Sequence, residues 1–231
     1  MITAARQIGA EWERTRYRVA ALCATAFPLM LLVGGIVTLV GSPMLDGGPI
    51  TAEELGRWTL DHEPAIETGQ LIVALSVFPM VGLFAILATS TGRALGWFGS
   101  MLGGLAAAIT MVSAALRTEP ASTLGFFENA SDPGSALAFF TMSAGYHLDV
   151  MIDLLVAVGI LATAVTLRAS NVISMRMGTA IVSAASLTVI LALVNIGRIG
   201  IVLTGLILAA ALWQAPSRTD VSTGQKRLEL G

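Results

Sequence analysis

Apolar residues in this chain fall into long runs separated by short polar segments. An α-helix needs about 20 apolar residues to cross a hydrocarbon layer about 30 Å thick. The runs therefore predict an all-α fold, a polytopic transmembrane six-helix bundle. The predicted spans are Val19 to Val40, Gly69 to Thr89, Ala94 to Leu116, Tyr146 to Leu167, Met177 to Asn195 and Ile199 to Trp213.

The last two spans are the least certain part of this pattern. They are separated only by NIGRIG at residues 195–200, whose glycines and asparagine indicate a tight turn. The final span has about 15 residues, close to the lower limit for crossing. A five-span alternative would place Arg198 in the middle of the membrane and the C-terminus outside.

Charge distribution predicts the orientation, because Lys and Arg of short loops stay on the cytoplasmic side. The side that carries both termini holds ten of the 13 Lys and Arg residues, and the other side holds 11 of the 15 acidic residues. We therefore expect an N-in/C-in protein, multi-pass in a bacterial inner (cell) membrane. The expected parts are a cytoplasmic segment at 1–18, a transmembrane domain at 19–215 with outer loops at about 41–68 and 117–145, and a disordered cytoplasmic tail at 216–231.

Composition agrees with a lipid environment and argues against a nucleic-acid partner. The chain is 55% hydrophobic and 12% charged, whereas soluble domains have about 25% charged residues. A net charge of −2 without a basic stripe argues against nucleic-acid binding. The single cysteine, Cys23, excludes an intrachain disulfide. No catalytic motif is present, and no cofactor is predicted.

The stretch AGYHLDVMIDLLVAVG at residues 144–159 places acidic residues at the start of a predicted span. Tyr146, Asp149 and Asp153 lie within about 60° of one another on a helix, whereas His147 points elsewhere. Asp153 lies about 22 Å above Arg168, inside the hydrocarbon layer. A carboxylate at that depth usually faces the bundle interior and has a partner.

Arg117 and Arg198 are the expected partners, since both fall at a similar height at the outer ends of predicted spans. One hypothesis is an ion-pair pin that fixes helix rotation. The other is a proton-linked or cation-linked binding site, because neighbouring carboxylates repel each other and one can retain a proton. Exposure of Asp149 to lipid headgroups, with no role, is the third alternative.

The outer loops carry further candidates. Glu67 could join the acidic site, and His62 and His147 are weak candidates for metal ligands, although the acidic loop can also simply be solvated. TAEE at residues 51–54 fits a capping box that opens a surface helix from Ala52 to about His62, ended by Pro64. Asp132 and Pro133 predict the start of a helix along the outer interface before span four.

Prolines and small residues mark features inside the spans. Pro28 and Pro79 lie near the membrane midplane and predict kinks, which occur both at transporter substrate sites and in ordinary spans. Small residues form two ridges on the third span, which suit close packing within the bundle or a homodimer face. The ridges are Gly96, Ser100, Gly104, Ala108 and Gly99, Gly103, Ala107.

Three segments carry a resemblance to a known group: RTRYRVAAL at 14–22, HEPAIETGQLI at 62–72 and LTGLILAAALW at 203–213. With them the chain resembles a bacterial, actinobacterial-type family of small six-helix integral membrane proteins of unknown function. This resemblance implies the six-helix fold and assigns no catalytic residues.

Three functional hypotheses follow from the sequence. The first is an outward-facing acidic pocket that binds or transports a small solute or cation, with proton coupling. The second is an accessory or assembly subunit of a larger membrane complex. The third is a membrane-embedded enzyme that uses the outer histidines and carboxylates.

Overall fold

The structure is a computed structural model that describes residues 2–42, 51–124, 132–194 and 196–215. This part of the chain is helical and contains no strand. Its helices are α1 (Ile2–Leu39), α2 (Ala52–Asp61), α3 (Glu63–Leu75), α4 (Val77–Thr91), α5 (Ala94–Leu124), α6 (Asp132–Ala169), α7 (Met175–Leu193) and α8 (Gly197–Trp213). The predicted tail at 216–231 lies outside the described residues.

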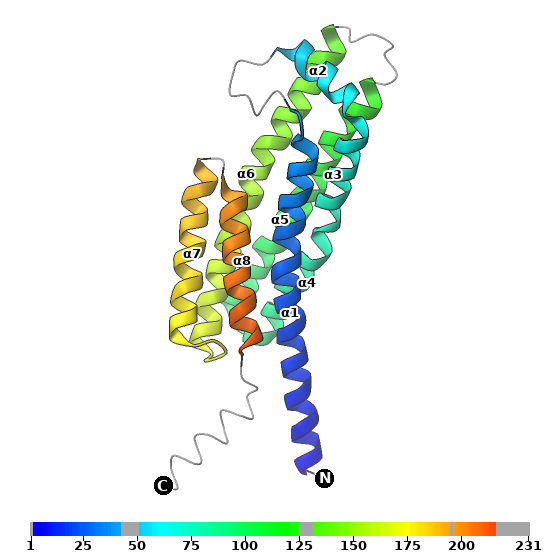
Figure 1. Ribbon diagram of the computed structural model, residues 1–231. Helices are drawn as coiled ribbons and strands as arrows, with labels where there is room; N and C mark the ends of the chain where they lie inside the picture. Colours follow the sequence, from blue (N-terminus) through cyan, green and yellow to red (C-terminus); the bar gives the residue numbers. More distant parts are fainter. Residues whose placement is uncertain (1, 43–50, 125–131, 195, 216–231) are drawn as a thin grey trace.

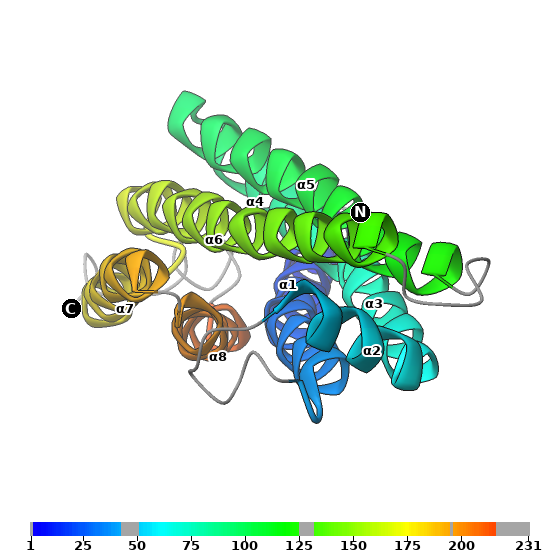
Figure 2. The same ribbon diagram turned by 90° about the horizontal axis from the view of Figure 1, so that it is seen from above.

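The long helices form a bundle (Figure 1). Helices α5 and α6 lie side by side, and α1 packs between α3 and α8. Helices α7 and α8 form a hairpin that packs against α6 and α1. The helices of the hairpin are shorter than α1, α5 and α6. The short helix α2 covers the end of the bundle opposite the N-terminal end of α1 (Figures 1 and 2).

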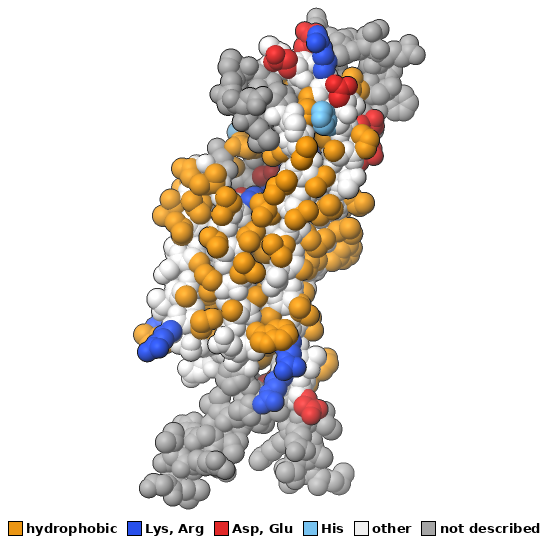
Figure 3. Space-filling model, in the orientation of Figure 1, with side chains coloured by type: hydrophobic (Ala, Val, Ile, Leu, Met, Phe, Trp, Pro, Cys, Tyr) orange, Lys and Arg blue, Asp and Glu red, His pale blue; other side chains and the backbone are white. Residues whose placement is uncertain are grey.

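Among the described residues, five helical segments are long and apolar enough to cross a membrane. They are Glu11–Leu39, Glu63–Ser90, Ala94–Thr118, Phe139–Ala169 and Met175–Leu193, and α8 is a shorter apolar helix. Hydrophobic side chains cover the middle of the molecule, whereas charged side chains gather near its two ends (Figure 3). The described part of the chain is thus all-helical, and the length and composition of its helices fit a multi-pass membrane protein.

The surface helix predicted from Ala52 to about His62 is confirmed, since α2 ends at Asp61 and His62 is its C-cap. Pro64 lies in the first turn of the next helix, α3, where its missing N–H costs no hydrogen bond, so the second span begins at Glu63 rather than Gly69. The prediction of a separate interfacial helix after Pro133 is wrong. Helix α6 runs unbroken from Asp132 to Ala169, since no proline interrupts it after its first turn.

The two prolines act differently. Pro28 lies inside α1, which continues past it. Pro28 has no N–H, so the carbonyl oxygen of Ala24 lacks its helical donor. Helix α8 packs closely against this point: a Cβ added to Gly205 would lie 2.6 Å from that oxygen. Before Pro79 the helix breaks at Ser76, which separates α3 from α4.

One of the two small-residue ridges on α5 packs inside the bundle. A Cβ on Gly99 would lie 2.7 Å from the carbonyl oxygen of Gly159 on α6, and a Cβ on Gly103 would collide with the ring of Phe84 on α4. By contrast, nothing lies within 4 Å of a Cβ added to Gly104. The predicted packing role therefore holds for Gly99 and Gly103. In the other ridge, Ser100 donates to the carbonyl oxygen of Phe84 on α4, whereas Gly104 faces outward.

The predicted capping box at the start of α2 is confirmed. The backbone N–H of Glu54 donates to the hydroxyl of Thr51 over 3.2 Å, and the backbone N–H of Thr51 donates to the carboxylate of Glu54 over 3.0 Å. These bonds hold the pKa of the Glu54 carboxyl below its usual value.

A group with a lowered folded-state pKa stabilises the fold above its unfolded pKa, and this stabilisation is lost as pH falls through the folded value. We expect hydrogen exchange of the α2 amides, corrected for intrinsic rates, to speed up as pH falls below the usual Glu range. Thr51→Ala should expose the same amides already at neutral pH. Equal pH dependence in both proteins would contradict this role of the box.

Candidate functional site

A cavity of about 350 Å³ lies in the half of the bundle nearest α2. Such a volume is at the lower end of the range for ligand sites, about 300–1,000 Å³. Helix α1 supplies much of the wall with Leu31, Leu32, Gly35, Ile36, Thr38 and Leu39, and Val40 follows directly after it. Helices α2, α3 and α6 add Trp58, Val73, Met142, Tyr146 and Val150. Acidic and basic atoms are visible in a recess of the surrounding apolar surface (Figure 3).

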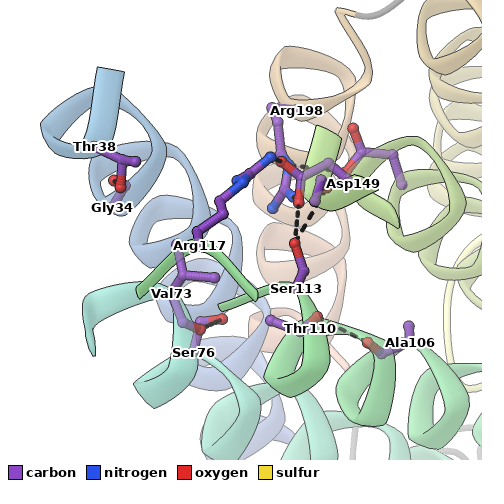
Figure 4. A network of polar contacts seen from close by, with 12 residues as sticks. Gly34, Thr38, Val73, Ser76, Ala106, Thr110, Ser113, Arg117, Asp149 and Arg198 are labelled. Atoms are coloured by element: carbon purple, nitrogen blue, oxygen red, sulfur yellow. Dashed lines mark hydrogen bonds and ion pairs between the residues drawn. The ribbon is translucent and has the colours of Figure 1, made fainter. Parts of the chain in front are cut away.

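The charged part of the lining consists of Arg117, Asp149, Asp153 and Arg198, which we call the charge cluster. Asp149 bridges two helices, since Arg117 Nη2 lies 2.7 Å from its Oδ2 and Arg198 Nη2 lies 2.6 Å from its Oδ1. Arg198 also pairs with Asp153, with Nε 3.1 Å from Oδ1. Figure 4 shows Arg117 and Arg198 converging on Asp149 from α5 and α8.

Local sequence explains why these groups meet. Asp149 and Asp153 are one helical turn apart on α6 and therefore share a face. Arg198 lies in the first turn of α8, so the hairpin turn delivers it to that face. Ser113 on α5 donates to Asp149 Oδ1 and lies equally close to the carbonyl oxygen of Gly145, 3.2 Å in each case.

Two glycines create the room for the charge cluster. A Cβ on Gly197 would lie 2.6 Å from Asp153 Oδ2, and a Cβ on Gly145 would lie 2.7 Å from Arg117 Nε. Real Cβ atoms do not approach other atoms that closely. These positions therefore let α8 and α6 carry the charged side chains at close range.

Two buried polar atoms of the cluster have no hydrogen bond within the described part of the chain: Arg198 Nη1 and Asp153 Oδ1. The contact between Arg198 Nε and Asp153 Oδ1 is an ion pair that does not meet hydrogen-bond geometry. The Asp153 side chain is only 6% exposed. Buried polar atoms usually have a partner, so this donor and this acceptor are unsatisfied groups inside the charge cluster.

The structure gathers most, but not all, of the predicted site residues. Asp149, Asp153, Arg117, Arg198 and Tyr146 all line the cavity. Tyr146 is 43% exposed and lies at the rim. Glu67, in contrast, is exposed and is absent from the lining.

The two histidines lie apart from the charge cluster. His62 stacks on Trp58, and its Nδ1 lies 3.0 Å from the carbonyl oxygen of Trp58. His147 is exposed and contacts the ring of Tyr146 edge to face. Within the ranges that the structure describes, no three His, Cys, Asp or Glu side chains lie close enough together to hold a metal ion.

Sequence reasoning missed the cavity wall on α1 and the contacts of Ser113, Gly145 and Gly197. The apolar wall residues look like any other residues of a membrane span. The glycines did carry a signal, because GR at 197–198 places a glycine beside Arg198 and AGY at 144–146 places one beside Tyr146, both predicted site residues.

No family model, curated protein or solved structure matches this chain. The function is therefore argued from the site itself.

Proposed function

We propose that the chain crosses the inner membrane of a bacterium six times, with both termini in the cytoplasm. The positive-inside distribution supports this topology, and α8 runs antiparallel to α7 towards the end of the bundle that holds the N-terminus (Figure 1). The charge cluster then faces the outer side. The weak family resemblance is consistent with this architecture.

A cysteine-labelling experiment tests the topology. In a Cys23→Ala background, Arg57→Cys on α2 should react with a membrane-impermeant maleimide on intact cells. Arg176→Cys at the start of α7 should react only after the membrane is opened. Labelling of Arg176→Cys on intact cells would contradict the proposed orientation.

We propose further that the cavity binds a small solute from the outer side of the membrane. The observation that supports this most strongly is an apolar-walled cavity of about 350 Å³ that ends at the charge cluster. Ligand sites commonly combine apolar walls with a few convergent polar groups. If the protein also transports this solute across the membrane, the same cavity would be its binding site during transport.

The charge balance favours a solute over a bare cation. The two arginines of the cluster compensate the two aspartates through the ion pairs described above. A cation would have to compete with two guanidinium groups for the same oxygens. If solute binding is coupled to a proton carried by Asp153, the substitution Asp153→Asn should change both the affinity for the solute and the pH dependence of that affinity.

Native mass spectrometry of gently extracted protein tests solute binding. We expect the wild type to carry a reproducible small adduct. Gly35→Leu should lose it, because Gly35 lines the cavity and a Cβ there meets nothing within 4 Å, so the larger side chain fills the cavity without a clash. Gly104→Leu is the matched control, since a Cβ at Gly104 is equally unhindered on a surface away from the cavity.

An adduct that persists in Gly35→Leu would contradict binding in this cavity. A stoichiometric second protein in place of an adduct would favour the accessory-subunit hypothesis. In that case the charge cluster would act as an ion-pair pin between α5, α6 and α8.

A further inference from the structure

The cavity opens on the side of the bundle. Three of its lining residues, Ile36, Leu39 and Val40, are also exposed. Figure 3 shows a recess on the side of the molecule that is surrounded by hydrophobic side chains, whereas α2 covers the end of the bundle (Figure 1). Exposed apolar side chains of a membrane-spanning helix face lipid, so the cavity opens towards hydrocarbon chains.

The position at which α8 begins explains this opening. Gly205 of α8 packs against Ala24 and Pro28 of α1. Helix α8 begins at Gly197, about 12 Å from Gly205 along the helix axis. Because α8 and α1 run in opposite directions (Figure 1), this start lies beside about Gly35. The exposed lining residues lie beyond it, where α8 no longer fills the space that α1 and α6 line.

The polar groups in the lining already have partners. The hydroxyl of Thr38 donates to the carbonyl oxygen of Gly34 and accepts from Gln70, and the indole N–H of Trp58 donates to the carbonyl oxygen of Val40. The side chains of the charge cluster pair with one another, and the two cluster atoms without a hydrogen bond have almost no accessible surface. Water, which needs about two to four polar partners, is therefore poorly suited to fill the cavity.

The volume of the cavity limits the shape of its occupant. An α-helix with its side chains is about 10–12 Å across, so a length of about 10 Å fills roughly 800–1,100 Å³. The cavity has about 350 Å³ and cannot admit a helix of a partner protein or of a second copy. A single hydrocarbon chain is narrow and flexible, and the surrounding bilayer supplies it in excess.

We infer that the occupant is an acyl chain of a phospholipid in the outer leaflet, which enters beside Ile36 and Val40. The head group of this lipid stays near Tyr146 at the rim. This inference rests on the proposed solute binding and names the chemical class of the solute. The chain gives the apolar walls the van der Waals contacts that an empty cavity lacks.

Trp58 can report on this chain, because it lines the cavity and is only 6% exposed. A protein that keeps Trp58 alone, with Trp12, Trp97 and Trp213 replaced by Phe, is reconstituted in phosphatidylcholine bilayers. The acyl chains of the lipid are either brominated or plain, and bromine quenches indole fluorescence on contact. A second protein that keeps only Trp97, which is 54% exposed on α5, reports ordinary contact with the surrounding lipid.

We expect brominated chains to quench Trp58 as well as Trp97. Gly35→Leu should restore most of the Trp58 emission and leave Trp97 quenched, because the new side chain fills the cavity and not the surface of α5. Gly104→Leu should leave both tryptophans quenched. Trp58 emission that is equal in the two lipids, or equally quenched in Gly35→Leu, would overturn the inference.

Native mass spectrometry separates this inference from the proposed solute binding. An adduct with the mass of a phospholipid, lost in Gly35→Leu, is the expected result. An adduct with the mass of a free fatty acid or of a water-soluble molecule, lost in the same variant, would overturn the phospholipid and leave solute binding intact. Absence of any adduct together with unquenched Trp58 would overturn both.

Discussion

Arg198→Met is expected to lower the free energy of unfolding by about 3–5 kcal/mol, because removing one member of a buried ion pair leaves unpaired charge behind. Arg198 pairs with both aspartates of the charge cluster and has a side chain only 20% exposed. Its loss leaves Asp153 without a cation and Asp149 with Arg117 alone. Unfolding in a mixed detergent titration, followed by tryptophan fluorescence, measures the change.

A second substitution should restore much of the loss. In Arg198→Met/Asp153→Asn the remaining charges, Arg117 and Asp149, form a balanced pair, so we expect most of the stability to return. Arg57→Met is the control, because its pair with Glu53 is exposed on α2 and should contribute less than about 1 kcal/mol. If Arg198→Met were no more damaging than Arg57→Met, the charge cluster would not hold α8 against α6.

The second large effect is expected at the contact between α1 and α3. A Cβ on Gly69 would lie 2.3 Å from Thr38 Oγ1 and 2.7 Å from both the Thr38 nitrogen and the Gly34 carbonyl oxygen. Two of these atoms belong to the backbone and cannot move without separating the helices. Gly69→Val should therefore destabilise the protein by about 3 kcal/mol, the upper part of the usual range for overpacking.

The same substitution should also break a buried hydrogen bond. Gln70 Nε2 donates to Thr38 Oγ1 over 2.8 Å, and separating α1 from α3 would lengthen it. Gly104→Val is the matched control, since nothing lies near a Cβ there and the change should be close to neutral. Equal unfolding curves for the two variants would show that the close approach of α1 and α3 does not matter.

Hydropathy predicted the helices well, because crossing a hydrocarbon layer requires long apolar runs whatever the tertiary packing is. It failed at the membrane boundary, where aqueous and lipid environments both tolerate a helix. The segment after Pro133 shows this, because a proline near the start of a helix is compatible with a short interfacial helix and with one continuous span. The structure has one continuous helix there, α6.

The charged half of the site could also be predicted. Helical spacing places Asp149 and Asp153 on one face, and the cost of a buried carboxylate points to Arg117 and Arg198 as partners. The cavity itself could not be predicted. Its lining comes from α1, α2, α3, α5, α6 and α8, and that combination depends on packing between distant segments rather than on any local pattern.

Ligand linkage provides the most direct test that the cavity is occupied by a solute. A solute at about 100 times its Kd stabilises the protein by about 2.7 kcal/mol. We expect exhaustive washing with clean detergent to lower the stability of the wild type and of Gly104→Leu by an amount of this order, and a membrane lipid extract to restore it. Gly35→Leu should respond to neither treatment. An equal response of all three proteins would contradict solute binding in this cavity and leave the charge cluster as a purely structural pin.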